Sequence, residues 1–121
     1  MQRNIIEIDK QGIVYIIPFE HIWMSEMELV ELFGVITPTL RAAIRAVYKS
    51  GVLKPYEAER YIKLPNGYGM DVYALPMIVA LAFRINTSNA EMVRKTLLRL
   101  CLRKEREVLL VSMGNSPSCR C

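Results

Sequence analysis

The sequence holds 121 residues, of which 52% are hydrophobic and 23% are charged, with a formal net charge of +4 at pH 7. This balance excludes an intrinsically disordered chain and predicts one globular domain. The positive excess is compatible with a polyanionic partner but does not require one. The most apolar stretch, residues 72–85, contains Pro76 and is too short to span a bilayer, so we expect a cytoplasmic protein.

The N-terminal residues predict a β-hairpin. Strand-like runs at residues 5–8 and 13–17 flank the turn-forming Asp9-Lys10-Gln11-Gly12. The chain has three cysteines, no Cys-x-x-Cys pair and a single histidine, His21, for which a packed or surface position is expected. Because so few ligand types are present, we expect no metal and no cofactor.

Two helices follow, separated by a glycine corner. Ser25 and Glu28 form a capping-box pattern that predicts a short helix, and Gly34 is suited to end it. Thr37 then offers a cap for a second helix, with Pro38 at its first position. This second helix is predicted to run to Lys49, before Ser50-Gly51.

The second helix has an apolar side and a basic side. At about 100° per residue, one side collects Leu40, Ala43, Ile44 and Val47, and the other collects Arg41, Arg45 and Lys49. A helix-turn-helix places such a helix in the DNA major groove. In that interpretation Thr39 and Arg41 are the best candidates for base contact, Arg45 and Lys49 contact phosphates, and Thr37 is a further DNA-binding candidate. The alternative is a packed corner whose cations form only a solvated face.

A second hairpin is predicted about Asn66-Gly67, the strongest short hairpin signal in the chain. Helix, turn, helix and hairpin is the order of a winged helix-turn-helix domain. Lys63 lies near the hairpin tip and is the candidate for a phosphate contact from the wing. A purely structural hairpin is the alternative.

The C-terminal half predicts two helices. An apolar one begins at Pro76, and a long one begins at a second capping box, from Ser88 to Glu91, and runs to about Val111. The long helix has a core-facing stripe formed by Ala90, Val93, Leu97, Leu100 and Cys101, which predicts a buried Cys101 thiol.

The same long helix has apolar residues on another side, namely Leu98, Leu102 and Leu109. A helix that is apolar on two sides is often buried twice, so we expect a homodimer or partner interface there. The alternative is a terminal helix wrapped around its own domain.

Several of these segments resemble the RhuM family of bacterial virulence-associated, mobile-element proteins. The matching residues are Trp23, Leu32-Phe33-Gly34-Val35, Ile44, Val47-Tyr48-Lys49, Gly51, Leu53, Tyr73, Leu75, Met77-Ile78, Arg84 and Asn86. The resemblance covers about residues 22–100. The resemblance implies a DNA-binding module without enzyme chemistry.

Together these patterns predict an α+β, winged helix-turn-helix-like domain over residues 1–113, with an N-terminal β-hairpin and a long C-terminal helix. A flexible tail is expected at residues 114–121. The expected function is non-catalytic binding of double-stranded DNA in transcriptional or mobile-element regulation. The alternative is a protein–protein interaction module on a degenerate helix-turn-helix scaffold, without specific DNA binding. No catalytic constellation is recognisable in the sequence.

Overall fold

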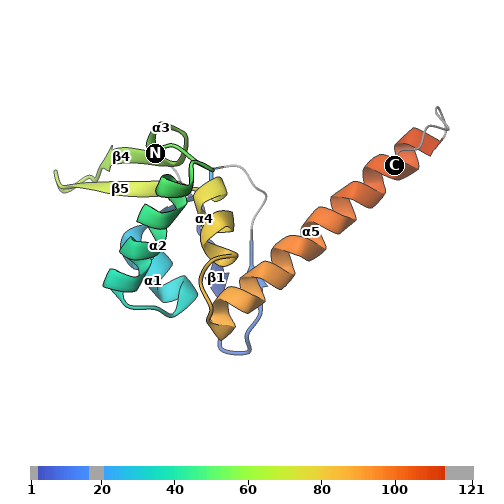
Figure 1. Cartoon of the computed structure of the whole chain (residues 1–121), viewed down its shortest axis with the longest axis horizontal. Coiled ribbons are helices and arrows are strands. Elements are labelled where there is room, and N and C mark those ends of the chain that lie inside the picture. The colour runs from blue at the N-terminus through green and yellow to red at the C-terminus, as the bar shows by residue number, and fades with distance from the viewer. Residues whose placement is uncertain (1–2, 17–20, 114–121) are drawn as a thin grey trace.

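The structure is a computed structural model that describes residues 3–16 and 21–113, with side-chain surroundings described through Arg103. Figure 1 shows helices packed against a small antiparallel sheet, and a long C-terminal helix that points away from them. The α+β class predicted from the sequence is confirmed. The expected tail at residues 114–121 lies outside the described residues, and so does the side chain of Leu109.

The elements follow one another along the chain as short strands and helices. In order they are β1 (Glu7–Ile8), β2 (Val14–Tyr15), β3 (Trp23–Ser25), α1 (Glu26–Phe33), α2 (Thr37–Ser50), α3 (Pro55–Ala58), β4 (Glu59–Lys63), β5 (Gly69–Ala74), α4 (Leu75–Ala82) and α5 (Ser88–Met113).

The predicted N-terminal hairpin is present, but its paired strands are shorter than the apolar runs. Only β1 and β2 pair, with Ile8 opposite Val14. Asp9 closes the turn, because its carboxylate accepts hydrogen bonds from the backbone N–H groups of Gln11 and Ile13, at 2.9 and 2.8 Å. The turn residues therefore act as predicted, and the ladder ends soon after them.

The main sheet has three antiparallel strands in the order β3-β5-β4. β3 leads into α1 and pairs along β5, with Trp23 opposite Ala74, so the start of α1 is tied to the strand that leads into α4. β4 and β5 form the hairpin predicted about Asn66-Gly67. Gly67 adopts a φ of 90°, whereas Asn66 has no positive φ. The Gly67 N–H donates to the Leu64 carbonyl, so Pro65 is the second residue of a four-residue turn, a position that favours proline.

The helix–turn–helix corner forms largely as predicted. The Ser25 hydroxyl accepts from the Glu28 N–H at 3.3 Å, and the Glu28 carboxylate accepts from the Ser25 N–H at 2.8 Å. Gly34 ends α1 in the left-handed region, with a φ of 64°. The predicted cap at Thr37 is wrong, because Thr37 is already the first residue of α2. The Leu40 N–H, which a Thr37 cap would have taken, donates instead to the Ile36 carbonyl at 3.1 Å.

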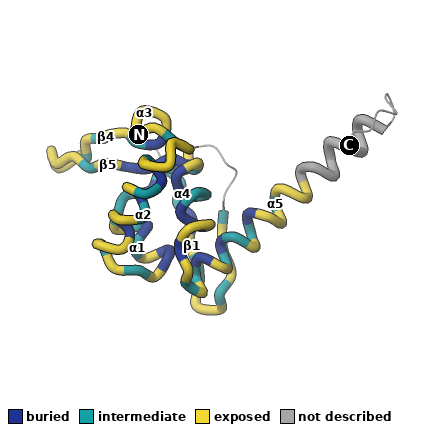
Figure 2. Tube along the Cα trace, in the orientation of Figure 1, coloured by how far each residue is buried: buried dark blue, intermediate teal, exposed yellow. Residues whose placement is uncertain are grey.

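The hydrophobic core lies where α1, α2, α4 and the first turns of α5 meet (Figure 2). These helices contribute Leu29, Leu32 and Phe33, then Leu40, Ile44 and Val47, then Met77, Ile78, Leu81 and Ala82, and finally Ala90, Val93 and Leu97. The amphipathic division predicted for α2 is therefore confirmed. α4 begins at Leu75, one residue before the predicted Pro76.

The start of α5 differs by one residue from the prediction. Ser88 lies inside the helix, and Thr87 takes the capping role. The Thr87 hydroxyl accepts from the Ala90 N–H at 3.1 Å and donates to the Phe33 carbonyl at 2.7 Å. Thr87 caps the helix in place of Ser88, because its hydroxyl satisfies both a free N–H group at the start of α5 and a free carbonyl group at the end of α1.

Within the described side chains of α5, Ser88 to Arg103, the first turns provide the residues buried in the core (Figure 2). The buried stripe ends at Leu97, Leu100 is half-buried, and Cys101 is exposed. The prediction of a buried Cys101 is wrong, because this residue lies beyond Leu97, the last α5 residue of the described core, on a helix that points away from the domain (Figure 1). No helix in the described part of the chain, α5 included, combines the length and apolarity that crossing a membrane requires.

Candidate nucleic-acid interface

The outer side of α2 displays the three cations predicted to contact DNA. Arg41, Arg45 and Lys49 are all exposed, and their spacing places them one above another on the helix surface. The opposite side buries Leu40 and Ile44 in the core, which fixes the rotation of the helix. The result is a basic row on a rigid element, and this row is called the α2 basic face below.

Arg41 differs from the other two cations, because it is held by a carboxylate. Its Nε donates to Glu26 Oε2 and its Nη2 donates to Glu26 Oε1, both at 2.9 Å. The hydrogen bonds to Glu26 raise the pKa of Arg41 above its ordinary value. The Arg41 side chain remains 59% exposed, so the pair adds little to folding stability but fixes the direction of the guanidinium.

The rest of the α2 basic face is open. Within the described part of the chain, Arg45 and Lys49 form neither an ion pair nor a side-chain hydrogen bond. Thr39 is exposed close to the start of the helix, whereas Thr37 is half-buried. The α2 basic face therefore presents two charges without a partner among the described residues, Arg45 and Lys49, in addition to the oriented guanidinium of Arg41.

A polar contact ties the far end of α2 to the sheet. The Tyr48 hydroxyl on α2 donates to the Glu59 carboxylate on β4 at 2.6 Å. Burial raises the pKa of Tyr48 well above its usual range, and the hydrogen bond to Glu59 adds to this. Burial also raises the pKa of Tyr73, on β5, to about 12, with Glu59 and Asp71 adding to the effect. Both hydroxyls therefore keep their protons at neutral pH.

The β4–β5 hairpin is joined to α2 through the hydrogen bond between Tyr48 and Glu59. Side chains alternate along β4, so Lys63 shares a sheet face with Tyr61 and with Glu59, which contacts α2 through Tyr48. Lys63 is exposed, and so are Tyr61 and Tyr68 near the hairpin tip. The structure thus gathers Arg41, Arg45 and Lys49 on one helix and places Lys63 on the hairpin that follows.

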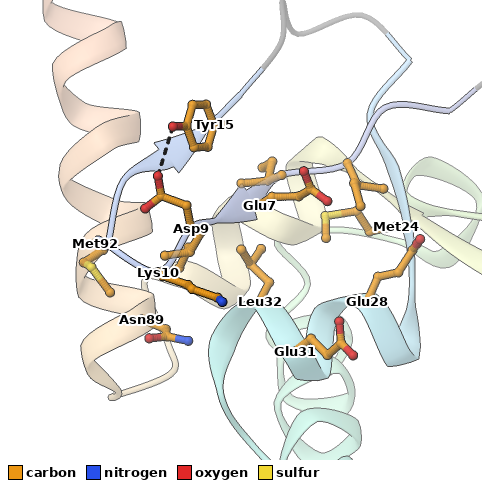
Figure 3. A pocket seen from close by; sticks show the side chains of 14 residues that line it. Glu7, Asp9, Lys10, Tyr15, Met24, Glu28, Glu31, Leu32, Asn89 and Met92 are labelled. Carbon is orange, nitrogen blue, oxygen red and sulfur yellow. Dashed lines mark hydrogen bonds between the residues drawn. The ribbon is translucent and has the colours of Figure 1, made fainter.

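A second feature is an acidic groove between the N-terminal hairpin, α1 and α5 (Figure 3). Its volume is about 650 Å³, and its walls carry the acids Glu7, Asp9, Glu28 and Glu31 and one cation, Lys10, among polar and apolar side chains. Asp9 is taken up by its own turn and by the Tyr15 hydroxyl at 2.9 Å. This lining is unfavourable for a polyanion, in contrast to the α2 basic face.

Glu28 is also committed to structure. Its carboxylate accepts from Arg3 Nη1 at 2.7 Å, in addition to its place in the capping box. Partial burial opposes ionisation, but the hydrogen bonds from Arg3 and the Ser25 backbone hold the pKa of Glu28 below its ordinary value. Among the residues that the structure describes, no three His, Cys, Asp or Glu side chains are grouped to hold a metal ion.

The Glu26–Arg41 pair was missed by sequence reasoning, as was the stacking of Arg60 over the Trp23 ring at 4.6 Å. The residues of each pair are far apart in the chain, so no helical or strand spacing links them. The one available signal for Glu26 was the contrast between an acidic first helix and a basic second helix.

The predicted partner surface on α5 is accessible. Leu98 is 50% exposed and Leu102 is 57% exposed, and they lie one turn apart on the helix. Leu109 belongs to the same prediction, and its side chain lies outside the described part of the chain.

Comparison with family models, with curated proteins and with solved structures found no match to this chain. The geometry of the site itself therefore carries the functional argument.

Proposed function

We propose that this chain is a non-catalytic, double-stranded DNA-binding protein of the winged helix-turn-helix type. The observation that carries the proposal is the α2 basic face, where Arg45 and Lys49 are exposed and have no ion-pair partner among the described residues, on a helix whose other side is buried. A helix of this kind fits the major groove, and its cations replace counterions around the phosphates. A cytoplasmic regulator of transcription or of a mobile element is the expected role.

Each predicted residue has a place in this proposal. Thr39 and Arg41, near the start of α2, face base edges, with Thr37 beside them. Arg45 and Lys49 meet phosphates further along the helix. The β4–β5 hairpin acts as the wing and brings Lys63 to the backbone of the same duplex.

The chain order supports the winged interpretation. β3, α1, α2 and the β4–β5 hairpin follow one another, and the hydrogen bond from Tyr48 to Glu59 ties the far end of α2 to β4. The resemblance to RhuM proteins implies the same class of function and stays a prediction.

Binding to a pool of genomic double-stranded fragments across a salt series tests the proposal, with sequencing of the retained DNA. We expect an enriched motif and a steep fall of affinity with salt. The double variant Arg45→Ala with Lys49→Ala should reduce the slope of log K against log salt by about 2. The matched control removes two exposed cations of α5, Lys95→Ala with Arg99→Ala. Equal slopes for the wild type and the Arg45 and Lys49 variant would reject the α2 basic face as the site.

The second candidate function is a protein–protein interaction module, in which α5 pairs with α5 of a second copy. The observation in its favour is the exposure of Leu98 and Leu102 on a helix that extends away from the domain (Figure 1). A homodimer covers such leucines and leaves the charged residues at the rim.

Sedimentation of the wild type against Leu98→Glu with Leu102→Glu tests this candidate. A dimer that becomes a folded monomer in the variant supports it. A wild-type monomer at tens of micromolar concentration argues against it, and the DNA-binding proposal is unaffected by that result.

A further inference from the structure

The contact between Arg41 and Glu26 leaves one edge of the guanidinium unused. Nε and Nη2 each donate one N–H to the carboxylate of Glu26. A guanidinium carries five N–H bonds in a planar fork, so both bonds of Nη1 and the outer bond of Nη2 remain. One bond of Nη1 and the outer bond of Nη2 point away from the side chain and form its distal edge, which is a two-pronged donor, and the other Nη1 bond points back beside Cδ.

The distal edge suits a neutral acceptor pair better than a charged one. O6 and N7 of guanine match the spacing of a guanidinium edge, and this is the commonest base-specific contact in the major groove. A phosphate offers similar spacing but carries negative charge. Because the Glu26 carboxylate lies against the same guanidinium, it offsets the attraction of Arg41 for phosphate more than its attraction for guanine.

The pair also restricts how Arg41 moves. Glu26 is the first residue of α1, directly after the Ser25 cap, and Arg41 is in the second turn of α2, so both backbones are fixed. An arginine with 59% exposure would otherwise sample many rotamers. Holding it in one direction reduces the freedom lost when a base is bound.

We propose that Glu26 is a positioning residue, which holds Arg41 so that the distal edge of the guanidinium is free to read a guanine. This inference rests on the proposed DNA-binding function. Arg41 then provides sequence selectivity and contributes little to the salt dependence. Arg45 and Lys49 provide most of the salt dependence and little of the selectivity, because each brings a charge with no partner among the described residues to the phosphates.

Selection of the full-length protein on a randomised double-stranded oligonucleotide pool tests this division of roles. The proteins compared are the wild type, Arg41→Ala, Glu26→Ala, Glu26→Gln and the Glu26 and Arg41 double alanine variant. Glu31→Gln is the matched control, because it removes another acid of the same helix, which is exposed. Glu26→Gln keeps the size of the side chain, so it answers the question if Glu26→Ala fails to fold. Thermal melts establish that each variant is folded.

We expect the wild type to prefer guanine at one position of its site. Arg41→Ala and Glu26→Ala should each reduce that preference about tenfold, with little change in the salt slope. Glu31→Gln should behave like the wild type, and Glu26→Ala should have no further effect once Arg41 is absent.

Three results overturn the inference while DNA binding itself is retained. One is a Glu26→Ala protein that binds more tightly and keeps its guanine preference, because Glu26 then only competes with DNA for Arg41. Another is a guanine preference lost in Arg41→Ala and intact in both Glu26 variants. The third is wild-type binding with no guanine preference, which leaves the DNA-binding proposal in place. A wild type that retains no DNA rejects the proposed function itself, and the inference with it.

Discussion

The Thr87 hydroxyl joins two helices, and its removal tests how the domain is held together. It accepts from the Ala90 N–H and donates to the Phe33 carbonyl, so Thr87→Val removes both hydrogen bonds and keeps the shape of the side chain. Loss of a helix cap costs about 1 kcal/mol. The lost bond to a partly buried carbonyl costs about 1 kcal/mol more. The expected loss of unfolding free energy is therefore about 2 kcal/mol.

Urea denaturation followed by the fluorescence of Trp23, the single tryptophan, measures this loss. In a thermal melt the same change should lower Tm by about 6–10 °C for a domain of this size. Thr87→Ser keeps the hydroxyl and should stay close to the wild type. Ser88→Ala is the matched control, because the capping pattern in the sequence points to Ser88 and the structure places it within α5. If Ser88→Ala destabilises the protein as much as Thr87→Val, the assignment of the cap to Thr87 is wrong.

Three further perturbations follow from contacts near the site. Glu28→Gln should destabilise the protein by about 1 kcal/mol at neutral pH, after allowance for solvent screening. Since the folded pKa of Glu28 is lowered, the difference from wild type should be full above pH 4.5 and fade as pH falls through the folded pKa, as urea titrations at several pH values can show. Gly34→Ala should cost about 1–2 kcal/mol because of the φ of 64°. It should cost more than Gly51→Ala, because a Cβ at Gly34 lies 3.2 Å from Asn89 Nδ2 and one at Gly51 meets nothing within 4 Å; equal melting shifts would contradict this. Tyr48→Phe should cost about 1 kcal/mol in the same urea assay by leaving the Glu59 carboxylate without its donor, and an unchanged midpoint would show that water replaces the hydroxyl.

Local sequence patterns were sufficient for the corner between α1 and α2, apart from the cap at Thr37. The Ser25–Glu28 capping box and the stop at Gly34 involve residues within a few positions of one another, and both are present. The same holds for the two sides of α2 and for the hairpin about Asn66-Gly67. Such features depend on backbone geometry that repeats every few residues, and a sequence reports that geometry directly.

The candidate site was predictable only in part. Periodicity alone placed Arg41, Arg45 and Lys49 on one exposed face. It did not reveal that Glu26 neutralises and orients Arg41, because the two residues meet across the corner between α1 and α2. The proposed division between a base-reading arginine and phosphate-binding cations therefore depends on the tertiary structure.

Where α5 begins and where it leaves the core were also decided by the tertiary structure. Ser88 and Thr87 are both reasonable caps by local chemistry, and the Phe33 carbonyl of α1 selects Thr87. The apolar stripe of α5 continues past Leu97 in the sequence, yet Leu97 is the last residue of α5 in the described core and Cys101 is exposed. A periodic pattern tells which side of a helix is apolar, and only the packed fold tells how much of that side is covered.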